Sequence, residues 1–517
     1  MTRGRKGGLL LAAALAGLGA WTLVLRGQGR GIPLITDEGE YAVAARAWAS
    51  GGLPYRDAFS QKPPFIFLFY RAAAAVSSSP ESPRLAGAAV VLLTLLVLFL
   101  CAPRSWTAAG RLAAPAAFAA LSSLPIGDYG FPANTETFLN LFAALSALAV
   151  LRGAPFLAGL AAGAALTTKQ TAAWTVLGFG ALAASAGGRF SRRGALRYAL
   201  GAALIPGAWA AYFASRGALG DYWAQAWAGN ARYASVLLAT GALDGQLRWF
   251  ATLLLPRLVL FSLPALLLAG WSLRGLRAGA KHPVETITVV WFGAAVAGAL
   301  TGLFLFPHYF VQLAPALALG AGCGVERTAK AGRGRTAFAI AVLLAAWPAL
   351  LAPGLVFSAD ARGRALALLY PNPLFETKVL GRELARRAAP GDRLHVFGSE
   401  GALFVYSGLA PATPHTLCYA LTLFPKDASG WEAEMASLER TPPRFVVFST
   451  QPLSTMTSSR FGLDYRAAMI VFLEKGYRYD GAIVVSPSLE PPAYAAAAKG
   501  EAPAFGSEDR LLLFVRR

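Results

Sequence analysis

Charged side chains are scarce in this chain of 517 residues, of which aspartate, glutamate, lysine and arginine make up 14%. Soluble domains carry about 25% charged residues, so the composition argues against an ordinary soluble protein. Hydrophobic residues reach 56%, and the mean hydropathy is +0.49. We therefore expect a membrane protein.

Cysteine is also rare, with Cys101, Cys323 and Cys418 far apart in the sequence. This spacing excludes a disulfide framework and a cysteine-rich metal motif. A glycine-rich nucleotide fingerprint between a strand and a helix is missing, so no nucleotide-sugar donor is expected. The sequence shows no convincing internal repeat, which many transporters carry.

The net charge of +20 does not indicate nucleic-acid binding, because the basic residues lie largely in short loops between apolar segments. Basic residues in such loops set the orientation of a protein in its membrane. The predicted cytoplasmic loops carry Arg104, Arg111, Arg152 and the segments 188–197, 274–281 and 326–335. The short loops on the other side contain almost no lysine or arginine, apart from Lys169. The pattern predicts a multi-pass protein of the cell (inner or plasma) membrane with a cytoplasmic N-terminus.

About eleven apolar segments approach the ~20 residues that cross a bilayer. They lie near 8–26, 85–102, 112–126, 135–151, 154–167, 171–187, 198–215, 249–270, 286–305, 310–325 and 337–357. The first follows Arg3, Arg5 and Lys6 but lacks a clear cleavage site, so it is expected to remain as the first helix. The fifth is short enough to pack inside the protein rather than face lipid.

The composition changes after residue 357. Short apolar runs at 393–399, 444–450, 481–486 and 511–517 predict strands, and 376–388 and 464–476 have helical spacing. We therefore predict an α-helical polytopic membrane domain over 1–357 and an extracytoplasmic α/β domain over 358–517. Residues 27–84 would form the first extracytoplasmic loop, with interfacial helices.

Polar and ionisable residues gather on one predicted side of the membrane. They are Asp37, Glu38 and Lys62 in the first external loop, Asp128 and Glu136 in or beside the second, Lys169 in the next, and His308 with Tyr309 in a later one. Such groups are costly near a membrane and usually face a cavity or a partner. The sequence therefore predicts a site at the external surface.

The first loop also has a structural interpretation. Thr36 can cap a helix that begins at Asp37, where a carboxylate suits the helix dipole. Tyr41, Ala45 and Trp48 would then form the apolar face of an interfacial helix.

The other polar residues have structural interpretations as well. Lys62 and Lys169 can extend their ammonium groups to the interface. Glu136 can cap or pair at the mouth of its span, His308 can satisfy a backbone carbonyl, and Asp128 can be a turn residue. Spacing alone leaves both interpretations open.

The stretch "DEGEYAVAARAWASGGLPYRDAFSQKPPFIFLFY" at 37–70 resembles the first external loop of the GT-C glycosyltransferases. The most similar branch contains protein O-mannosyltransferase-like and aminoarabinose-transferase-like enzymes. The matching features are Asp37-Glu38, Tyr41, Gly52 with Pro54-Tyr55, and Lys62-Pro63-Pro64. Further on, "NTETFLNLF", "LTTKQTA" and "HYFVQLAPALAL" resemble later segments of the family in the same order, so the resemblance covers roughly residues 30–320.

The resemblance implies inverting transfer of a sugar from a polyprenyl-phosphate donor to an extracytoplasmic glycan, lipid or protein. It implies that Asp37 is the general base and that Lys62 stabilises the departing phosphate. It assigns Glu38 and Glu136 to catalysis as well, Tyr55, Lys169 and His308 to the donor phosphate, and Tyr41, Asp128 and Tyr309 to substrate. Some relatives bind a divalent metal between two acidic residues. Here these would be Asp37 and Glu136, and the glutamate in place of the more common aspartate leaves metal binding open.

Two other classes remain as alternatives. A transporter or flippase would also have many spans, although its polar groups tend to lie at the bilayer midplane. A polymerase or ligase of lipid-linked glycans would differ mainly in using an oligosaccharide donor. The identities of the sugar and of the acceptor do not follow from these residues.

Overall fold

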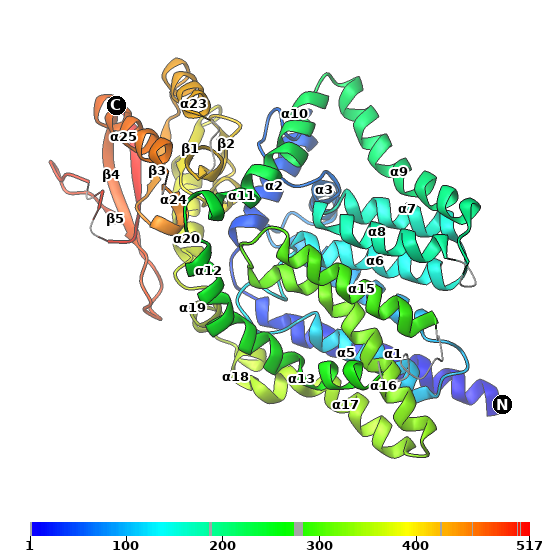
Figure 1. The fold of residues 1–517 in the computed structure, drawn as a ribbon. Coiled ribbons are helices and arrows are strands. Elements are labelled where there is room, and N and C mark those ends of the chain that lie inside the picture. Colours follow the sequence, from blue (N-terminus) through cyan, green and yellow to red (C-terminus); the bar gives the residue numbers. More distant parts are fainter. Residues whose placement is uncertain are drawn as a thin grey trace.

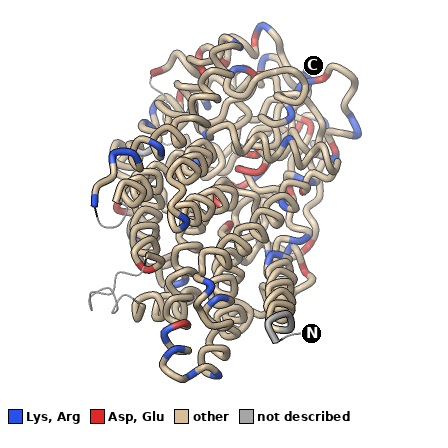
Figure 2. The backbone as a smooth tube through the Cα atoms, turned by 90° about the vertical axis from the view of Figure 1, so that its right-hand side faces the viewer, with Lys and Arg blue, Asp and Glu red and all other residues tan. Residues whose placement is uncertain are grey.

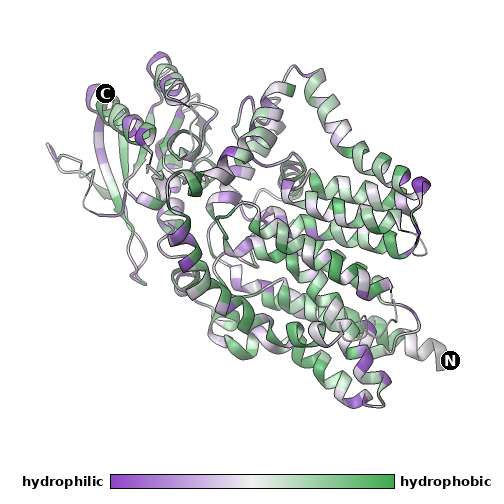
Figure 3. Cartoon of the chain, viewed as in Figure 1, coloured by the Kyte–Doolittle hydropathy of each residue, from purple (hydrophilic) through white to green (hydrophobic). Residues whose placement is uncertain are grey.

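The computed structural model describes residues 3–185, 189–272, 283–423, 427–457, 459–503, 505–506 and 508–517. A large helical part carries the N-terminus, and a smaller part with a β-sheet carries the C-terminus (Figure 1). The helical part is mostly hydrophobic, whereas the sheet part mixes both kinds of residue (Figure 3). The predicted fold class, a helical membrane protein with a C-terminal α/β part, is confirmed. The boundary at 357/358 stays a prediction.

Within the described ranges, the helical part contains α-helices and five short 3₁₀ or π helices. The α-helices are α1 (Arg3–Arg26), α2 (Thr36–Ala49), α3 (Phe65–Val76), α4 (Ser82–Cys101), α5 (Ala108–Leu121), α6 (Thr135–Leu151), α7 (Pro155–Leu166), α8 (Ala173–Ala184), α9 (Arg192–Ser215), α10 (Leu219–Trp223), α11 (Gly229–Ala239), α12 (Leu243–Trp249), α13 (Leu255–Ser272), α15 (Pro283–Leu300), α16 (Ala314–Lys330) and α17 (Gly334–Leu351). The short ones are η1 (Gly27–Gly29), η2 (Gln170–Ala172), η4 (Ala224–Ala228), η5 (Phe250–Leu254) and η6 (Pro307–Leu313).

The eleven predicted apolar segments fall on these helices, although the end of 171–187 and the loop 274–281 lie outside the described residues. Five described helices are long and apolar enough to cross a membrane, namely Gly7–Gly29, Ser82–Cys101, Leu243–Ser272, Pro283–Leu300 and Gly334–Leu351. Shorter apolar helices, such as α6 and α7, accompany them. The chain is a multi-pass membrane protein, and the number of spans stays a prediction.

Helices α7 and α9 cross closely because glycines line their contact. A Cβ atom on Gly159 would collide with the carbonyl oxygen of Tyr198, and one on Gly201 would collide with that of Phe156. Gly159 and Gly163 have the G-x-x-x-G spacing that lets two helix backbones approach in a membrane. The short α7 is therefore packed against protein along this face, as the sequence allows.

The C-terminal part contains a six-stranded sheet with strand order β2-β1-β3-β6-β4-β5. Strand β3 pairs in parallel with β1 and in antiparallel with β6, and all its residues are buried. The strands are β1 (Arg393–Phe397), β2 (Ala410–Pro411), β3 (Phe445–Ser449), β4 (Tyr477–Val484), β5 (Ala495–Ala496) and β6 (Arg510–Arg516). The helices are α18 (Pro353–Phe357), α19 (Ala361–Leu369), α20 (Leu374–Arg387), α21 (Ala402–Ser407), α22 (Tyr419–Thr422), α23 (Ser429–Arg440), α24 (Pro452–Thr455) and α25 (Arg460–Gly476).

The sheet part packs on the first loop through α2 and α21. A Cβ atom on Gly39 would collide with the backbone nitrogen of Ala402, so glycine is required for this close approach. Arg46 donates hydrogen bonds to the carbonyl oxygens of Phe404 and Leu409, at 2.9 and 2.7 Å. Protein therefore encloses much of α2, and the position of this helix at the membrane interface stays a prediction.

Candidate functional site

Helix α2 positions the two carboxylates of the first loop. The helix begins at Thr36 and its N-cap is Ile35, so the predicted cap at Thr36 is wrong by one residue. The Glu38 carboxylate caps the helix instead, because it accepts a hydrogen bond of 3.2 Å from the Ile35 backbone N–H. Asp37 and Glu38 point in different directions, since successive helix residues are about 100° apart.

Glu38 is fully buried and anchors the first loop. Arg84 forms an ion pair with it at 2.5 Å, and the Ala133 backbone N–H donates to it at 2.9 Å. Arg84 also donates to the carbonyl oxygens of Ile32 and Pro33. Because these partners occupy its oxygens, we remove Glu38 from the proposed catalytic residues and assign it a structural role.

Asp37 lies nearby in a more open position, with 24% of its side chain exposed. The Tyr41 hydroxyl donates to Oδ2 of Asp37 at 3.2 Å, and Nε2 of His308 lies 3.7 Å from the same oxygen. Tyr41 itself is completely buried. Tyr41 therefore orients the carboxylate. Its predicted role in substrate binding would require an exposed side chain, and Tyr41 is not exposed.

His308, on η6, faces three carboxylates. Its Nδ1 lies 2.5 Å from Oδ2 of Asp128, and its Nε2 lies 4.0 Å from Oε1 of Glu136 in addition to its contact with Asp37. Burial lowers the pKa of His308, but Asp128, Glu136 and Asp37 outweigh burial and raise it above its ordinary value. The protonated imidazole is therefore favoured.

Glu136 and Lys169 form a buried ion pair between the start of α6 and the turn before η2. The Lys169 ammonium also lies 4.0 Å from the centre of the Tyr309 ring. Burial lowers the pKa of Lys169, although Glu136 opposes this effect. Lys169 is enclosed by protein and does not extend to the membrane interface.

Lys62 is a cation of the site that forms no ion pair with any residue that the structure describes. Among the described residues, no carboxylate oxygen lies within 4.0 Å of its ammonium group. Burial lowers the pKa of Lys62, but the carboxylates of Asp37, Glu40 and Glu136 outweigh burial and raise it. The site thus contains a charged ammonium group able to bind an added anion such as phosphate.

Tyr55 fixes the backbone beside Lys62. Its hydroxyl donates to the Lys62 carbonyl oxygen at 2.8 Å, and its ring packs against Phe67, Phe213 and Tyr222. Tyr55 is 1% exposed, so we remove it from the proposed phosphate ligands. Its contribution is to hold the loop that presents Lys62.

The arrangement does not fit a divalent metal between Asp37 and Glu136. Across the described ranges, no group of three histidine, cysteine or acidic side chains is placed to hold a metal ion. The Lys169 ammonium also binds Glu136 directly, and it would repel a cation there. We therefore derive no step through a metal.

No protein-family model and no curated protein matches the sequence. ArnT from Cupriavidus metallidurans, solved with bound undecaprenyl phosphate, matches the structure with a TM-score of 0.56 and 16% sequence identity, over 98% of each chain. The chain has the GT-C fold. The apo form of that ArnT also matches, with a TM-score of 0.54, 16% identity, and coverage of 99% of this chain and 98% of that one.

A second similar structure belongs to an enzyme of a different activity. The oligosaccharyltransferase AglB from Archaeoglobus fulgidus, in complex with an inhibitory peptide and a dolichol-phosphate, matches with a TM-score of 0.52 and 11% identity. The match covers 98% of this chain and 76% of AglB. At these identities the likeness concerns the fold, and residue roles must come from the site itself.

Within this GT-C fold, the structure adds residues that the sequence analysis missed. Glu40 is 2% exposed and accepts hydrogen bonds from Ser60 and, at 3.5 Å, from Tyr419 of the sheet part. Burial raises the pKa of Glu40 to about 7. The i, i+3 spacing of Asp37 and Glu40 on α2 was a usable signal for Glu40, whereas nothing in the sequence indicated Tyr419.

Proposed function

We propose that the protein is a membrane glycosyltransferase that moves a sugar from a polyprenyl-phosphate donor to an extracytoplasmic acceptor. The observation that carries the proposal is a pair of opposite charges in the first loop. They are the Lys62 ammonium, which has no carboxylate oxygen within 4.0 Å in the described ranges, and the partly exposed Asp37 carboxylate. The fold supports it, since the two similar enzymes were solved with undecaprenyl phosphate and a dolichol-phosphate.

The proposed reaction uses these two charges on opposite sides of the anomeric carbon. Asp37 accepts the proton of the acceptor hydroxyl while the hydroxyl oxygen forms a bond to that carbon. The bond between the carbon and the phosphate oxygen breaks, and its electron pair stays on the phosphate. Lys62 stabilises the negative charge that develops there. Attack from the side opposite to the phosphate inverts the configuration.

The surrounding groups position the two reacting ones. Tyr41 fixes one oxygen of Asp37, and Tyr55 fixes the backbone of Lys62. His308 and Lys169 add positive charge at the back of the site, and Lys169 is neutralised by Glu136. We propose that His308, with Asp128 behind it, completes the phosphate-binding environment.

The proposal includes an orientation. The site lies on the external side of the cell membrane, the N-terminus is cytoplasmic, and residues 358–517 form an extracytoplasmic domain over the site. Basic segments at the end of the molecule that carries the N-terminus support it (Figure 2). The transferred group is a hexose or a pentose, as in the mannosyltransferase-like branch of the family.

The test uses purified protein in lipid with a panel of polyprenyl-phosphate sugars and acceptors, and mass spectrometry detects released polyprenyl phosphate. Wild type is compared with Asp37→Asn and Lys62→Ala. Asp244→Asn and Lys475→Ala are matched controls, because both residues are exposed and distant from the site in sequence. Release by wild type and controls with loss in both site variants supports the proposal. Transport of a lipid-linked sugar across vesicles without release would support the transporter alternative.

A further inference from the structure

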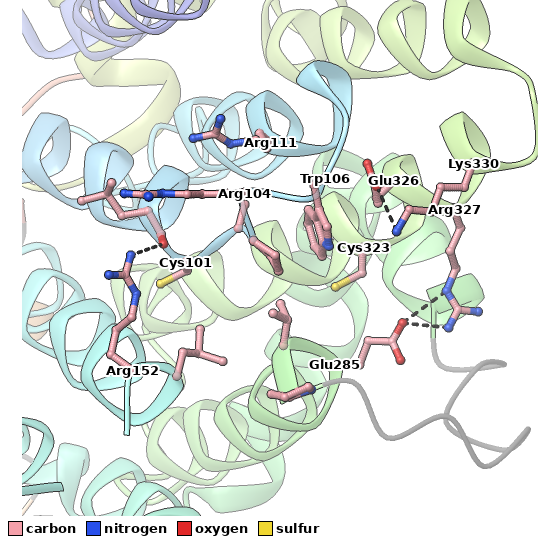
Figure 4. A pocket seen from close by; sticks show the side chains of 16 residues that line it. Cys101, Arg104, Trp106, Arg111, Arg152, Glu285, Cys323, Glu326, Arg327 and Lys330 are labelled. Carbon is pink, nitrogen blue, oxygen red and sulfur yellow. Dashed lines mark hydrogen bonds and ion pairs between the residues drawn. The ribbon is translucent and has the colours of Figure 1, made fainter. Parts of the chain in front are cut away.

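A second pocket lies at the opposite ends of the helices that carry the candidate site. Helix α6 begins beside Glu136 and ends next to Arg152, and Arg152 lines this pocket. The cavity has a volume of about 670 Å³ and is bounded by the ends of α4, α5, α6, α15 and α16. Figure 4 shows arginines on one wall and two carboxylates on the other.

The pocket has an excess of positive charge. Both carboxylates are already neutralised, because Glu285 pairs with Arg327 at 2.7 Å and Glu326 pairs with Lys330 at 3.3 Å. Thr107 donates two further hydrogen bonds to Glu326, of 2.8 and 2.6 Å. The remaining lining cations have no carboxylate within 4.0 Å among the described residues, and these are Arg104, Arg111 and Arg152.

Arg111 carries a donor for which no acceptor is found in the described part of the chain. Its Nε is buried and has no hydrogen-bond partner, and its guanidinium group lies 4.4 Å from the centre of the Phe99 ring. A buried donor of this kind calls for an explanation, and an acceptor from outside the chain would supply one. Arg152 approaches from α6 and makes one hydrogen bond of 3.4 Å, to the carbonyl oxygen of Leu100.

An apolar groove shares Arg152 with this pocket. This groove, of about 530 Å³, lies along α6 and α7, and its walls next to Arg152 include Leu148 and Leu157. Arg152 lines both cavities. A basic pocket and an apolar groove on either side of one arginine match a ligand with an anionic head and a hydrocarbon chain.

We propose that this pocket binds the phosphate of an anionic lipid, with a lipid chain in the groove between α6 and α7. The lipid comes from the leaflet opposite to the candidate active site, which the loop charges predict to be cytoplasmic. Arginine is suited to phosphate because its guanidinium group can donate two parallel hydrogen bonds. The bound lipid would join the ends of five helices and stabilise the protein. The proposal does not depend on the proposed reaction.

The test measures lipid binding to the purified full chain by native mass spectrometry, together with its Tm. The probes are phosphatidylglycerol, which is anionic, phosphatidylcholine, which is zwitterionic, and inorganic phosphate. The pocket variant is Arg104→Gln/Arg111→Gln/Arg152→Gln. The control is Arg192→Gln/Arg193→Gln/Arg197→Gln, which removes the same charge from exposed arginines of α9.

We expect phosphatidylglycerol to remain bound and to raise the Tm of wild type and control, with binding at least about tenfold weaker in the pocket variant. Arg152→Gln alone should weaken binding about fivefold, and it tests the site if the triple variant does not fold. Equal binding of phosphatidylcholine, or equal loss in the control, would overturn the proposal. Protection by inorganic phosphate as strong as that by phosphatidylglycerol would overturn the lipid assignment and indicate a soluble phosphate ligand.

Discussion

The Nε2 atom of His308 lies 3.7 Å from Oδ2 of Asp37, which joins a late external turn to the first loop. The imidazole is favoured in its charged form, so the proposed base has a cation on one side and the Tyr41 hydroxyl on the other. This contact makes the first loop and η6 a single site and suggests separate tests for each of its members.

Asp37 and Glu38 should give opposite results when their charge is removed. Asp37→Asn should lower sugar transfer by about 10²–10⁴-fold with little change in Tm, because the general base is lost. Glu38→Gln should destabilise the protein by about 3 kcal/mol, because Arg84 loses its buried partner. Turnover assays and thermal unfolding of both variants check this. Normal turnover by Asp37→Asn would exclude it as the base.

Replacing Lys62 should reduce activity, whereas replacing Lys169 should reduce stability. Lys62→Ala should lower transfer by about 10²–10³-fold and leave the Tm nearly unchanged, because a cation at the phosphate is removed. Lys169→Ala should lower the Tm, because it leaves Glu136 buried without its partner. Lys62→Arg, which keeps the charge, is the control and should retain part of the activity. A large loss of stability in Lys62→Ala would contradict our assignment.

His308 should give the protein a pH-dependent contribution to stability. The folded-state pKa of His308 is raised, so its contribution is complete below the ordinary pKa of about 6.5. This contribution is lost as the pH rises through the raised value. The Tm difference between wild type and His308→Gln should therefore be largest near pH 6 and shrink at pH 9. Asp128→Asn should move the decline to lower pH, and a constant difference across the range would refute the assignment.

Glu40 should show a pH dependence that ends near neutrality. Burial raises its pKa from 4.5 to about 7, so its neutral form stabilises the fold below pH 4.5 and this contribution is lost by pH 7. Glu40→Gln mimics the neutral form and should be more stable than wild type at pH 8, by about 3 kcal/mol at most. Unfolding measurements at pH 5 and pH 8 test this. If the difference in stability between Glu40→Gln and wild type is the same at pH 5 and pH 8, the raised pKa is disproved.

Gly39 should be intolerant of larger residues. Gly39→Leu would place a side chain where the backbone of Ala402 lies, so it should separate α2 from α21. We expect increased proteolysis between the two parts and a loss of transfer. Gly27→Leu is the control, because Gly27 is exposed and no atom lies within 4 Å of a Cβ built on it. Similar protease patterns for both variants would argue against the contact.

The sequence predicted the helical segments and the sheet well, because hydropathy and strand patterns depend on the chain locally. It also selected the residues that the structure brings together, such as Asp37, Glu136 and His308. The sequence could not distinguish the role of Glu38 from that of Asp37, because both lie in the first turn of α2. Only the folded structure shows that Glu38 pairs with Arg84. Tyr55 was misassigned for a similar reason, because aromatic residues in a loop give no sign of how deeply they are buried.

The partners of Glu40 show most clearly which contacts cannot be predicted from the sequence. Tyr419 lies in the sheet part, far along the chain, and no local pattern connects it with α2. Metal binding between Asp37 and Glu136 stayed open in the sequence because no local pattern shows that Lys169 binds Glu136. Both depend on contacts between segments that are distant in the sequence.

The contact of Tyr419 with Glu40, and the hydrogen bond of 2.9 Å from the Phe59 backbone N–H to the Pro414 carbonyl oxygen, place the sheet part against the candidate site. Its exchange for the corresponding part of a distant relative would therefore alter the surroundings of Lys62 and Asp37. Acceptor preference and donor chemistry in this protein would then evolve together, and an engineered chimera would need matched first loops to remain active.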